Sequence, residues 1–329
     1  MTWNGKALLQ ECLSSLASQT YSEKEVIVVD NGSTDGTLQV IKDTWSTLVS
    51  RVIENPFNTG FAKGCNQGIQ ASRGELVAFL NNDCRAQPGW IETMVKAALA
   101  HPEAGMFACK ILLSQDPSVI DNAGHLLFPD GLNFSRGRLE KDMHQYDRNE
   151  EVFFPSGAAS MFRKELLLDI QGLDEDFFAY GDDADLGLRA RLRGWSCLYI
   201  PDAVVYHRHS ATAGGYSPLK AYLVERNRIW VAVKCLPAAA LALSPFYSLV
   251  RYCLQAYGAI TGKGAAGRFS SPFALLWVLV RAWAGALRGL PRMWAKRREI
   301  QGNKRITAQE FLSLMQRFRI RATKISLTP

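Results

Sequence analysis

EVIVVDNGSTDGT, residues 25–37, joins a short β-branched run to a turn rich in Gly, Asn, Asp and Ser. Such a run is typical of a buried strand, and the turn residues end it. The order recurs: RVIENP (51–56) precedes GFAKGCNQGIQAS (60–72), and LVAFLN (76–81) precedes a helical stretch that Pro88 opens. Strands that alternate with helices predict an α/β fold with a mostly parallel central sheet.

Acidic residues follow two of these strands, since Asp30 ends the first and Asp83 follows LVAFLN. Ligands of open parallel sheets bind beyond the carboxyl ends of the strands, so we expect both acids to line one crevice. A sheet of this kind normally starts with a strand, whereas residues 1–19 predict a polar turn and a helix. We therefore expect the first strand to be missing.

The charge of the chain divides into two parts. Residues 1–218 hold 19 basic and 28 acidic side chains, a net of −9, whereas residues 219–329 hold 19 and 3, a net of +16. We expect an α/β domain over 1–218 and a basic helical region over 219–329 that meets a polyanion. Seven cysteines without a C-x-x-C pair, and no signal peptide, favour the cytoplasm.

Two apolar stretches, 235–250 and 272–280, lie between basic residues in the second part. Both are shorter than the roughly 18 to 20 apolar residues of a spanning helix, so they predict interfacial helices on the inner face of the cell membrane. Four tryptophans suit such a boundary: Trp230, Trp277, Trp283 and Trp294. The alternative is a soluble helical subdomain. Nucleic acid is disfavoured, because no recognition module accompanies the charge.

Several polar side chains are candidates for binding a ligand. Asp30 can accept hydrogen bonds from a base or a ribose, or it can serve only the turn. Asn58 and Asn66 belong to a glycine-rich stretch that either approaches a ligand or allows close helix packing. Asp83 can bind Mg²⁺ or Mn²⁺, or cap a turn, and His207 can complete a metal shell. The absence of G-x-G-x-x-G after a strand argues against an oxidoreductase.

The stretch GDDADLGLRARLRGW, 181–195, crowds three carboxylates at a predicted helix start: Asp182, Asp183 and Asp185. Capping the first turn of the predicted helix requires only one carboxylate. Neighbouring carboxylates raise one another's pKa, which suits a general base, although charges on a solvated helix end remain the alternative.

These motifs resemble the family-2 inverting glycosyltransferases of the GT-A fold, in particular the bacterial rhamnosyltransferase-like branch. The matching segments are TWNG (2–5), CLSSL (12–16), VIVVDNGSTDGT (26–37), NTGFAKGCNQGI (58–69), FLNND (79–83), PSGAASMFRKE (155–165), GLDEDFFAYGDDADLGLRARLRGW (172–195) and His207 with the SAT at 210–212. The resemblance implies a nucleotide-sugar donor, a glycan or lipid-linked acceptor, and a divalent cation.

The resemblance also implies a role for each matching residue. Asp183 is the expected catalytic base, supported by Asp182. The expected nucleotide-binding residues are Asp30, Asn58, Asn66 and Asn82, and the expected metal ligands are Asp83 and His207.

Two departures qualify these roles. The strand that normally precedes TWNG is missing, and Asn81 replaces the first acid of the usual triad, which weakens the metal site. The alternative to an active enzyme is a catalytically impaired nucleotide-sugar-binding or scaffold protein.

Overall fold

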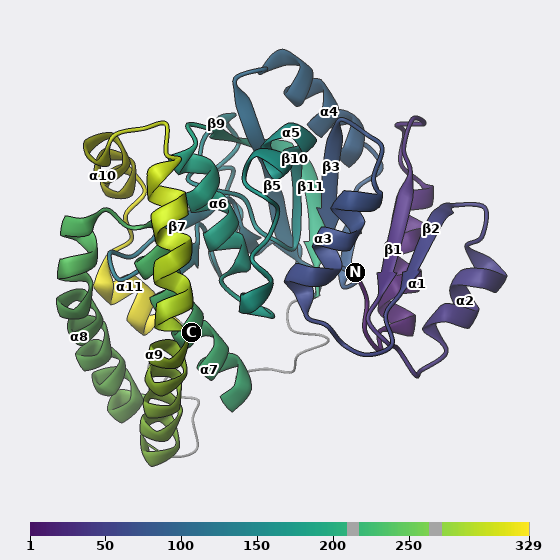
Figure 1. Ribbon diagram of the computed structural model, residues 1–329. Coiled ribbons are helices and arrows are strands. Elements are labelled where there is room, and N and C mark those ends of the chain that lie inside the picture. Colours follow the sequence, from purple (N-terminus) through teal and green to yellow (C-terminus); the bar gives the residue numbers. More distant parts are fainter. Residues whose placement is uncertain (209–216, 263–271, 329) are drawn as a thin grey trace. The chain divides into compact units, whose positions relative to one another are not determined.

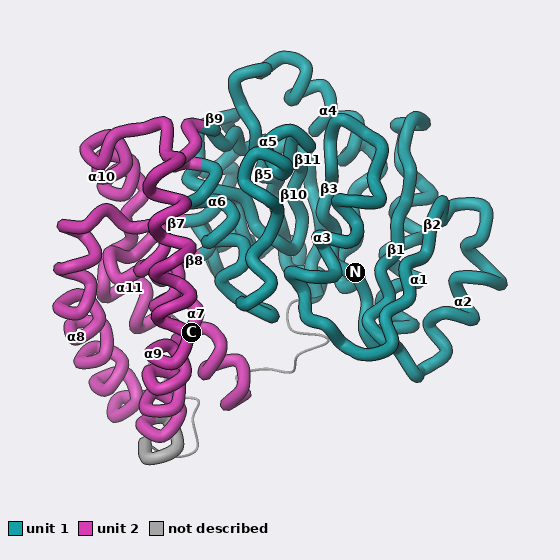
Figure 2. Tube along the Cα trace, viewed as in Figure 1, with its two compact units in different colours: residues 1–125, 135–190, 195–212 teal, residues 126–134, 191–194, 213–329 magenta. Residues whose placement is uncertain are grey.

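The computed structural model describes residues 1–208, 217–262 and 272–328 (Figure 1). The matching segment at 210–212 lies outside these residues. Figure 2 divides the chain into two compact units. Unit 1 comprises residues 1–125, 135–190 and 195–212, and unit 2 comprises residues 126–134, 191–194 and 213–329. The main division is near the expected boundary at 218, but two short segments from the first part belong to unit 2.

Unit 1 begins with a small parallel sheet. Helix α1 (Lys6–Ala17) precedes β1 (Val26–Asp30), and α2 (Thr37–Thr44) connects β1 to β2 (Val49–Glu54). Apolar side chains from both helices and both strands form one core, which includes Leu9, Leu13, Val26, Val28, Ile41 and Val49. The turn after β1 holds Asp30 at the carboxyl end of its strand, as the sequence predicts.

The main sheet of unit 1 has five strands in the order β3 (Leu76–Leu80), β10 (Ala159–Arg163), β5 (Ala104–Leu113), β11 (Ser196–His207) and β4 (Cys84–Ala86). Two short strands extend it: β6 (Ile120–Asn122) pairs with β5, and β9 (Glu150–Glu151) pairs with β11.

Only the β5–β11 pair of the main sheet is parallel, because β10 is antiparallel to both of its neighbours and β4 is antiparallel to β11. The expected mostly parallel sheet is therefore wrong, and the sheet is mixed. The chain between β5 and β10 returns through short strands and turns instead of one helical crossover, which lets β10 enter the sheet antiparallel.

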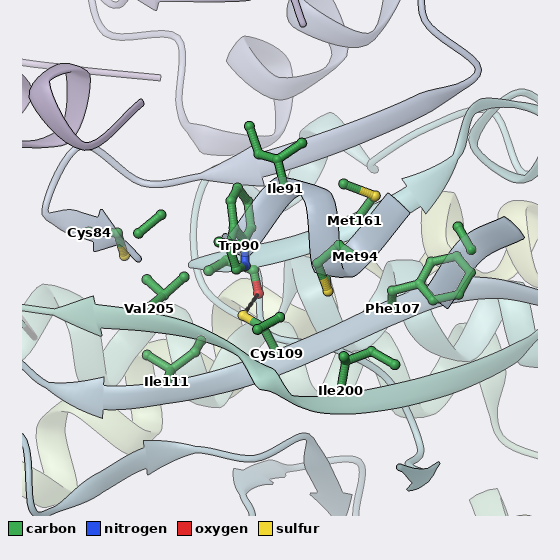
Figure 3. Close-up of a cluster of buried hydrophobic side chains, with 14 of the residues drawn as sticks. Cys84, Trp90, Ile91, Met94, Phe107, Cys109, Ile111, Met161, Ile200 and Val205 are labelled. Carbon is green, nitrogen blue, oxygen red and sulfur yellow. Dashed lines mark hydrogen bonds between the residues drawn. The ribbon is translucent and has the colours of Figure 1, made fainter. Parts of the chain in front are cut away.

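Helices cover the main sheet and supply its core. Helix α4 (Trp90–Ala100) packs on β5 and β11, and Figure 3 shows Trp90 and Met94 among side chains of β5, β10 and β11. The helix begins at Trp90 with Gly89 as its cap, so Pro88 precedes it instead of opening its first turn. The remaining helices of unit 1 are α3 (Phe61–Ala71), α5 (Lys164–Asp169), η1 (Glu175–Phe177) and α6 (Asp182–Leu192).

A cavity of about 510 Å³ separates the two sheets of unit 1. Val26, Ile27 and Val29 of β1 line one side of it, and residues 75–81 line the other. In the described chain, β1 pairs only with β2 besides the bridge to Thr2, and β3 pairs only with β10. The two strands therefore leave facing edges without a strand between them.

Unit 2 is mainly helical, as expected. Its long helices are α7 (Pro218–Cys235), α8 (Ala238–Thr261) and α9 (Pro272–Gly302), followed by α10 (Ala308–Arg317) and α11 (Ala322–Leu327). A short hairpin is formed by β7 (His125–Leu127) and β8 (Asn133–Ser135). Among the described helices, none combines the length and the apolar character needed to cross a membrane.

Buried ion pairs join the segment 126–134 to the helices of unit 2. Arg251 of α8 lies 2.7 Å from Asp130 and 2.9 Å from Glu225 of α7, and Arg228 also pairs with both acids. Two arginines and two carboxylates balance, which a buried ionic cluster requires. Trp230 is buried here and donates to the carbonyl of Ala286, so its expected place at a membrane boundary is wrong.

Helix α6 can pack closely on Phe154, in the segment between β9 and β10, because residue 187 is a glycine. A Cβ at Gly187 would lie 2.3 Å from Cβ of the fully buried Phe154, whereas one at Gly68 of α3 would meet only ordinary contacts, at 3.8 Å from Val29. We expect Gly187→Ala to lower the free energy of unfolding by about 1–3 kcal/mol, because overpacking displaces the core.

The matched variant Gly68→Ala should leave stability unchanged or raise it by up to about 1 kcal/mol, since alanine favours a helix. Urea unfolding followed by circular dichroism measures both. Equal midpoints for the two variants would contradict this account of α6.

Candidate active site

The end of β1 presents an acid with one unfilled acceptor. Asp30 is fully buried, and its Oδ2 accepts a hydrogen bond from the backbone N–H of Ser33 at 3.0 Å. Its Oδ1 has no hydrogen-bond partner among the described residues. A buried oxygen without a donor is costly, and a ligand N–H or O–H would satisfy it.

Thr2 connects the end of β1 to the end of β3. Its backbone donates to Val29 at 2.8 Å and accepts from Asn31 at 2.9 Å. Its hydroxyl accepts from the amide nitrogen of Asn82 at 3.0 Å. The carboxyl ends of the two strands therefore meet, as the sequence predicts, and Asn82 lies between them.

Asn58 and Asn66 have different environments. The side-chain oxygen of Asn58 accepts from the N–H of Gly60 at 2.9 Å and shapes the loop after β2. The amide of Asn66 donates to the carbonyl of Leu173 at 2.9 Å and to Glu175 at 3.0 Å, and accepts from the N–H of Leu173 at 2.8 Å. This amide therefore holds the segment before η1, which leaves it little capacity for the ribose or diphosphate.

Asp83 and His207 lie together at the edge of the main sheet. His207 is the last residue of β11 and pairs with Cys84 of β4, directly after Asp83. Its Nε2 lies 3.4 Å from Oδ1 of Asp83, and its Nδ1 lies 2.7 Å from Oδ2 of Asp121. His207 and Asp121 are buried, and Asp83 is partly buried. The sequence predicts the pairing of Asp83 with His207 but not the contribution of Asp121.

The electrostatics of this pair suit a cation. Burial by itself lowers the pKa of His207, but the hydrogen bonds and charges of Asp121 and Asp83 raise it to about 9. Two carboxylates thus attract positive charge to this point. Burial raises the pKa of the Cys84 thiol well above its usual value, so this neighbour is a neutral thiol instead of a thiolate.

The donor set fits a divalent cation. A carboxylate oxygen of Asp83, a ring nitrogen of His207 and the sulfur of Cys84 lie within 4.8 Å of one another. Oδ1 of Asp83 is buried, and its contact with Nε2 of His207, 3.4 Å long, is too loose to satisfy it fully. A carboxylate and an imidazole are ligands that Mn²⁺ accepts, and donor phosphates can supply further oxygens.

The start of α6 places two acids in unequal surroundings. Asp182 is buried, and its burial, followed by the charge of Asp183, raises its pKa from 3.8 to about 8. Asp182 therefore carries a proton at neutral pH. Asp183 is more exposed, with 21% of its side-chain surface accessible, and its Oδ1 accepts from the N–H of Ala184 at 2.8 Å. Asp185 pairs instead with Arg189, at 2.8 Å.

Contacts connect the acidic helix to the Asp83 side of the site. Tyr180, just before the helix, has a raised pKa because of burial and then the charges of Asp182 and Asp83, which places it near both. The carbonyl of Ala158 accepts from Asn81 at 2.8 Å, while the adjacent Gly157 N–H lies 3.5 Å from Asp183. The turn before Asp83 and the start of α6 therefore contact the same short segment, Gly157 and Ala158.

His125 is a second residue that the sequence reasoning missed. It is buried, it stacks on Phe154 with ring centroids 5.0 Å apart, and its Nε2 lies 3.8 Å from Oδ2 of Asp183. Both His125 and Asp121 belong to IDNAGH, 120–125, inside a polar stretch without periodicity. The only local signal is the apolar residues that flank these polar side chains, and that signal is weak.

Comparison with known proteins agrees with this arrangement. The sequence model for glycosyl transferase family 2 matches residues 1–170, just over half of the chain. An N-acetylglucosaminyl-diphospho-decaprenol L-rhamnosyltransferase of Mycobacterium tuberculosis is 28% identical over 246 residues, which cover 66% of this chain and 77% of that protein.

Two solved structures have a similar fold. GalNAc-T7 with UDP, GalNAc and Mn²⁺ has a TM-score of 0.61 at 14% identity, over 93% of this chain and 53% of that chain. The mannosyltransferase PcManGT from Pyrobaculum calidifontis, in complex with GDP-Man and Mn²⁺, has a TM-score of 0.52 at 21% identity, over 92% and 83%. The fold is GT-A, and the chain belongs to glycosyl transferase family 2.

Proposed function

We propose that the protein transfers a sugar, with inversion, from a nucleoside-diphosphate sugar to a hydroxyl group of a glycan or lipid-linked acceptor. One observation carries the proposal: the Asp83–His207 pair, whose carboxylate oxygen Oδ1 is only loosely contacted by the imidazole, borders the same site as the acids that begin α6. Family membership and the lipid-linked substrate in the name of the mycobacterial relative support it.

Asp183 is the proposed base. It takes the proton from the acceptor hydroxyl as that oxygen bonds to the anomeric carbon and the bond to the diphosphate oxygen breaks. Asp182 supports this role, because its proton leaves the negative charge of the pair on the more exposed Asp183. A positioned general base contributes about 10²- to 10⁴-fold to the rate.

Asp83 and His207 would hold the divalent cation, which neutralises negative charge on the departing diphosphate when bound. Asp30 would accept a hydrogen bond from the nucleoside through its unfilled Oδ1, with Asn58 and Asn82 beside it. We leave Asn66 out of the nucleotide site, because its amide already holds Leu173 and Glu175.

The basic helical region is the proposed contact with the membrane. Exposed apolar side chains of α8 recur on one helical face at Leu243, Phe246, Leu249, Tyr257 and Ile260, and those of α9 at Leu276, Trp277, Val280, Leu287 and Trp294. The net charge of +16 over 219–329 favours anionic lipid on the cytoplasmic side.

Asp183→Asn tests the base. Sugar nucleotides are first screened by thermal shift with Mn²⁺, since a donor at 100 times its dissociation constant adds about 2.7 kcal/mol of stability. With the donor found, we expect Asp183→Asn to lower kcat by about 10²- to 10⁴-fold and to bind donor as the wild type does. Asp202→Asn, which removes an exposed carboxylate of β11, is the control.

Transfer at the wild-type rate by Asp183→Asn would exclude Asp183 as the base. Donor binding without any turnover in the wild type would favour the alternative, a nucleotide-sugar-binding or scaffold protein.

Asp182→Asn tests the proton on the buried acid. The folded-state pKa of about 8 lies above the unfolded value near 4, so the native state binds the proton more tightly and its stability falls as pH rises between these values. Asparagine imitates the protonated acid at every pH. We expect Asp182→Asn to be more stable than the wild type at pH 8.5, with a smaller difference at pH 5, by urea unfolding. A constant difference at both pH values would contradict the raised pKa.

Vesicle sedimentation tests the membrane contact. We expect the full chain to bind vesicles that contain anionic phospholipid, and the double variant Phe246→Asp/Ile260→Asp to bind about tenfold or more weakly, because each lost apolar contact is worth about 1.5 kcal/mol or more. Leu99→Asp/Leu168→Asp changes two equally exposed leucines of unit 1 as the control. Equal binding by both double variants would overturn the assignment to α8.

A further inference from the structure

The segment Ile120–His125, sequence IDNAGH, lies beside both acidic groups of the site although it belongs to neither. Its strand β6 pairs with β5 through Ile111 and Leu112, on the side of β5 opposite β11. The segment is well ordered by its own contacts and deeply buried. A buried polar stretch requires partners for its side chains, and those partners identify its role.

Asp121 contacts the ring of His207. Its Oδ2 lies 2.7 Å from Nδ1 of His207, a distance typical of a strong hydrogen bond, and its Oδ1 lies 3.4 Å from Nη1 of Arg138. A carboxylate that accepts Nδ1–H leaves Nε2 as the nitrogen that faces Asp83. Second carboxylates of this kind fix the ring of a metal-binding histidine.

His125 lies at the other end of the segment, near Asp183. The side-chain oxygen of Asn122 accepts from the N–H of Gly124 at 2.7 Å, so its nitrogen donates to Nε2 of His125, at 3.3 Å. Burial lowers the pKa of His125, and stacking on Phe154 fixes the plane of the neutral ring. Nε2 therefore lies 3.8 Å from Oδ2 of Asp183 without donating to it.

We propose that Asp121 is a positioning residue of the active site, which holds His207 toward the cation. This proposal rests on the cation site of the proposed function. Asp121 does not contact the reacting atoms, so it acts through the ring that it holds. Its loss should therefore lower the affinity for the cation.

Mn²⁺ binding to the full chain tests the role of Asp121. Electron paramagnetic resonance measures free Mn²⁺ in titrations without nucleotide and with saturating UDP, GDP or dTDP. We expect Asp121→Ala to weaken binding by about 10- to 100-fold, and Asp121→Asn, which keeps an acceptor for Nδ1–H, to weaken it less. Asp116→Ala removes an exposed carboxylate of the same region, bonded only to Ser118, and should bind as the wild type does. Circular dichroism and thermal midpoints verify that each variant is folded.

The outcomes separate this proposal from the proposed function. Wild-type Mn²⁺ affinity in Asp121→Ala would overturn the role of Asp121. A wild-type chain that binds no Mn²⁺ with any nucleotide would instead remove the cation site itself. A wild-type chain that binds Mn²⁺ but transfers no sugar would remove the proposed function while leaving the test of Asp121 intact.

Discussion

The cost of removing carboxylates from water governs the site. Asp30, Asp121, Asp182 and Asp185 are almost completely buried, and each acid is stabilised by a different means. Asp121 accepts from His207, Asp185 pairs with Arg189, Asp182 retains a proton, and Asp30 accepts from the backbone of Ser33. Oxygens left without a donor, on Asp30 and Asp83, are then the places where bound groups gain most.

The arrangement also explains how one site can hold negative charge in two places. On the side of Asp83 two carboxylates attract positive charge, as the raised pKa of His207 indicates, whereas at the start of α6 a proton on Asp182 reduces the repulsion that Asp183 feels. A transferase of this kind needs charge stabilisation at the leaving group and a base at the acceptor. Because Asp182 is buried and Asp183 is more exposed, the two neighbouring acids differ in their affinity for a proton.

The sequence predicts those parts of the molecule that depend on local patterns. Strands β1 and β3, the helix that begins at Asp182, and the position of Asp83 and His207 at strand ends follow from hydrophobic runs, turn residues and family motifs. Local patterns do not predict the direction of β10 or the burial of Trp230, because both depend on where distant segments pack. Asp121 lies 86 residues from its partner His207, in a stretch with no periodicity, so only the tertiary structure identifies it.

The cavity between β1 and β3 affects the order in which the two sheets of unit 1 unfold locally. No backbone ladder joins the β1–β2 sheet to the main sheet among the described residues, so α1, which contacts both, carries much of the coupling. Sheets without shared hydrogen bonds can unfold as separate cooperative units, each with its own free energy of opening. Amide protons of β1 and β2 would then exchange with solvent faster than those of β5 and β11. Asp30, the acid proposed to bind the nucleoside, would then belong to the more easily opened part, and the acids at Asp83 and α6 to the more persistent one.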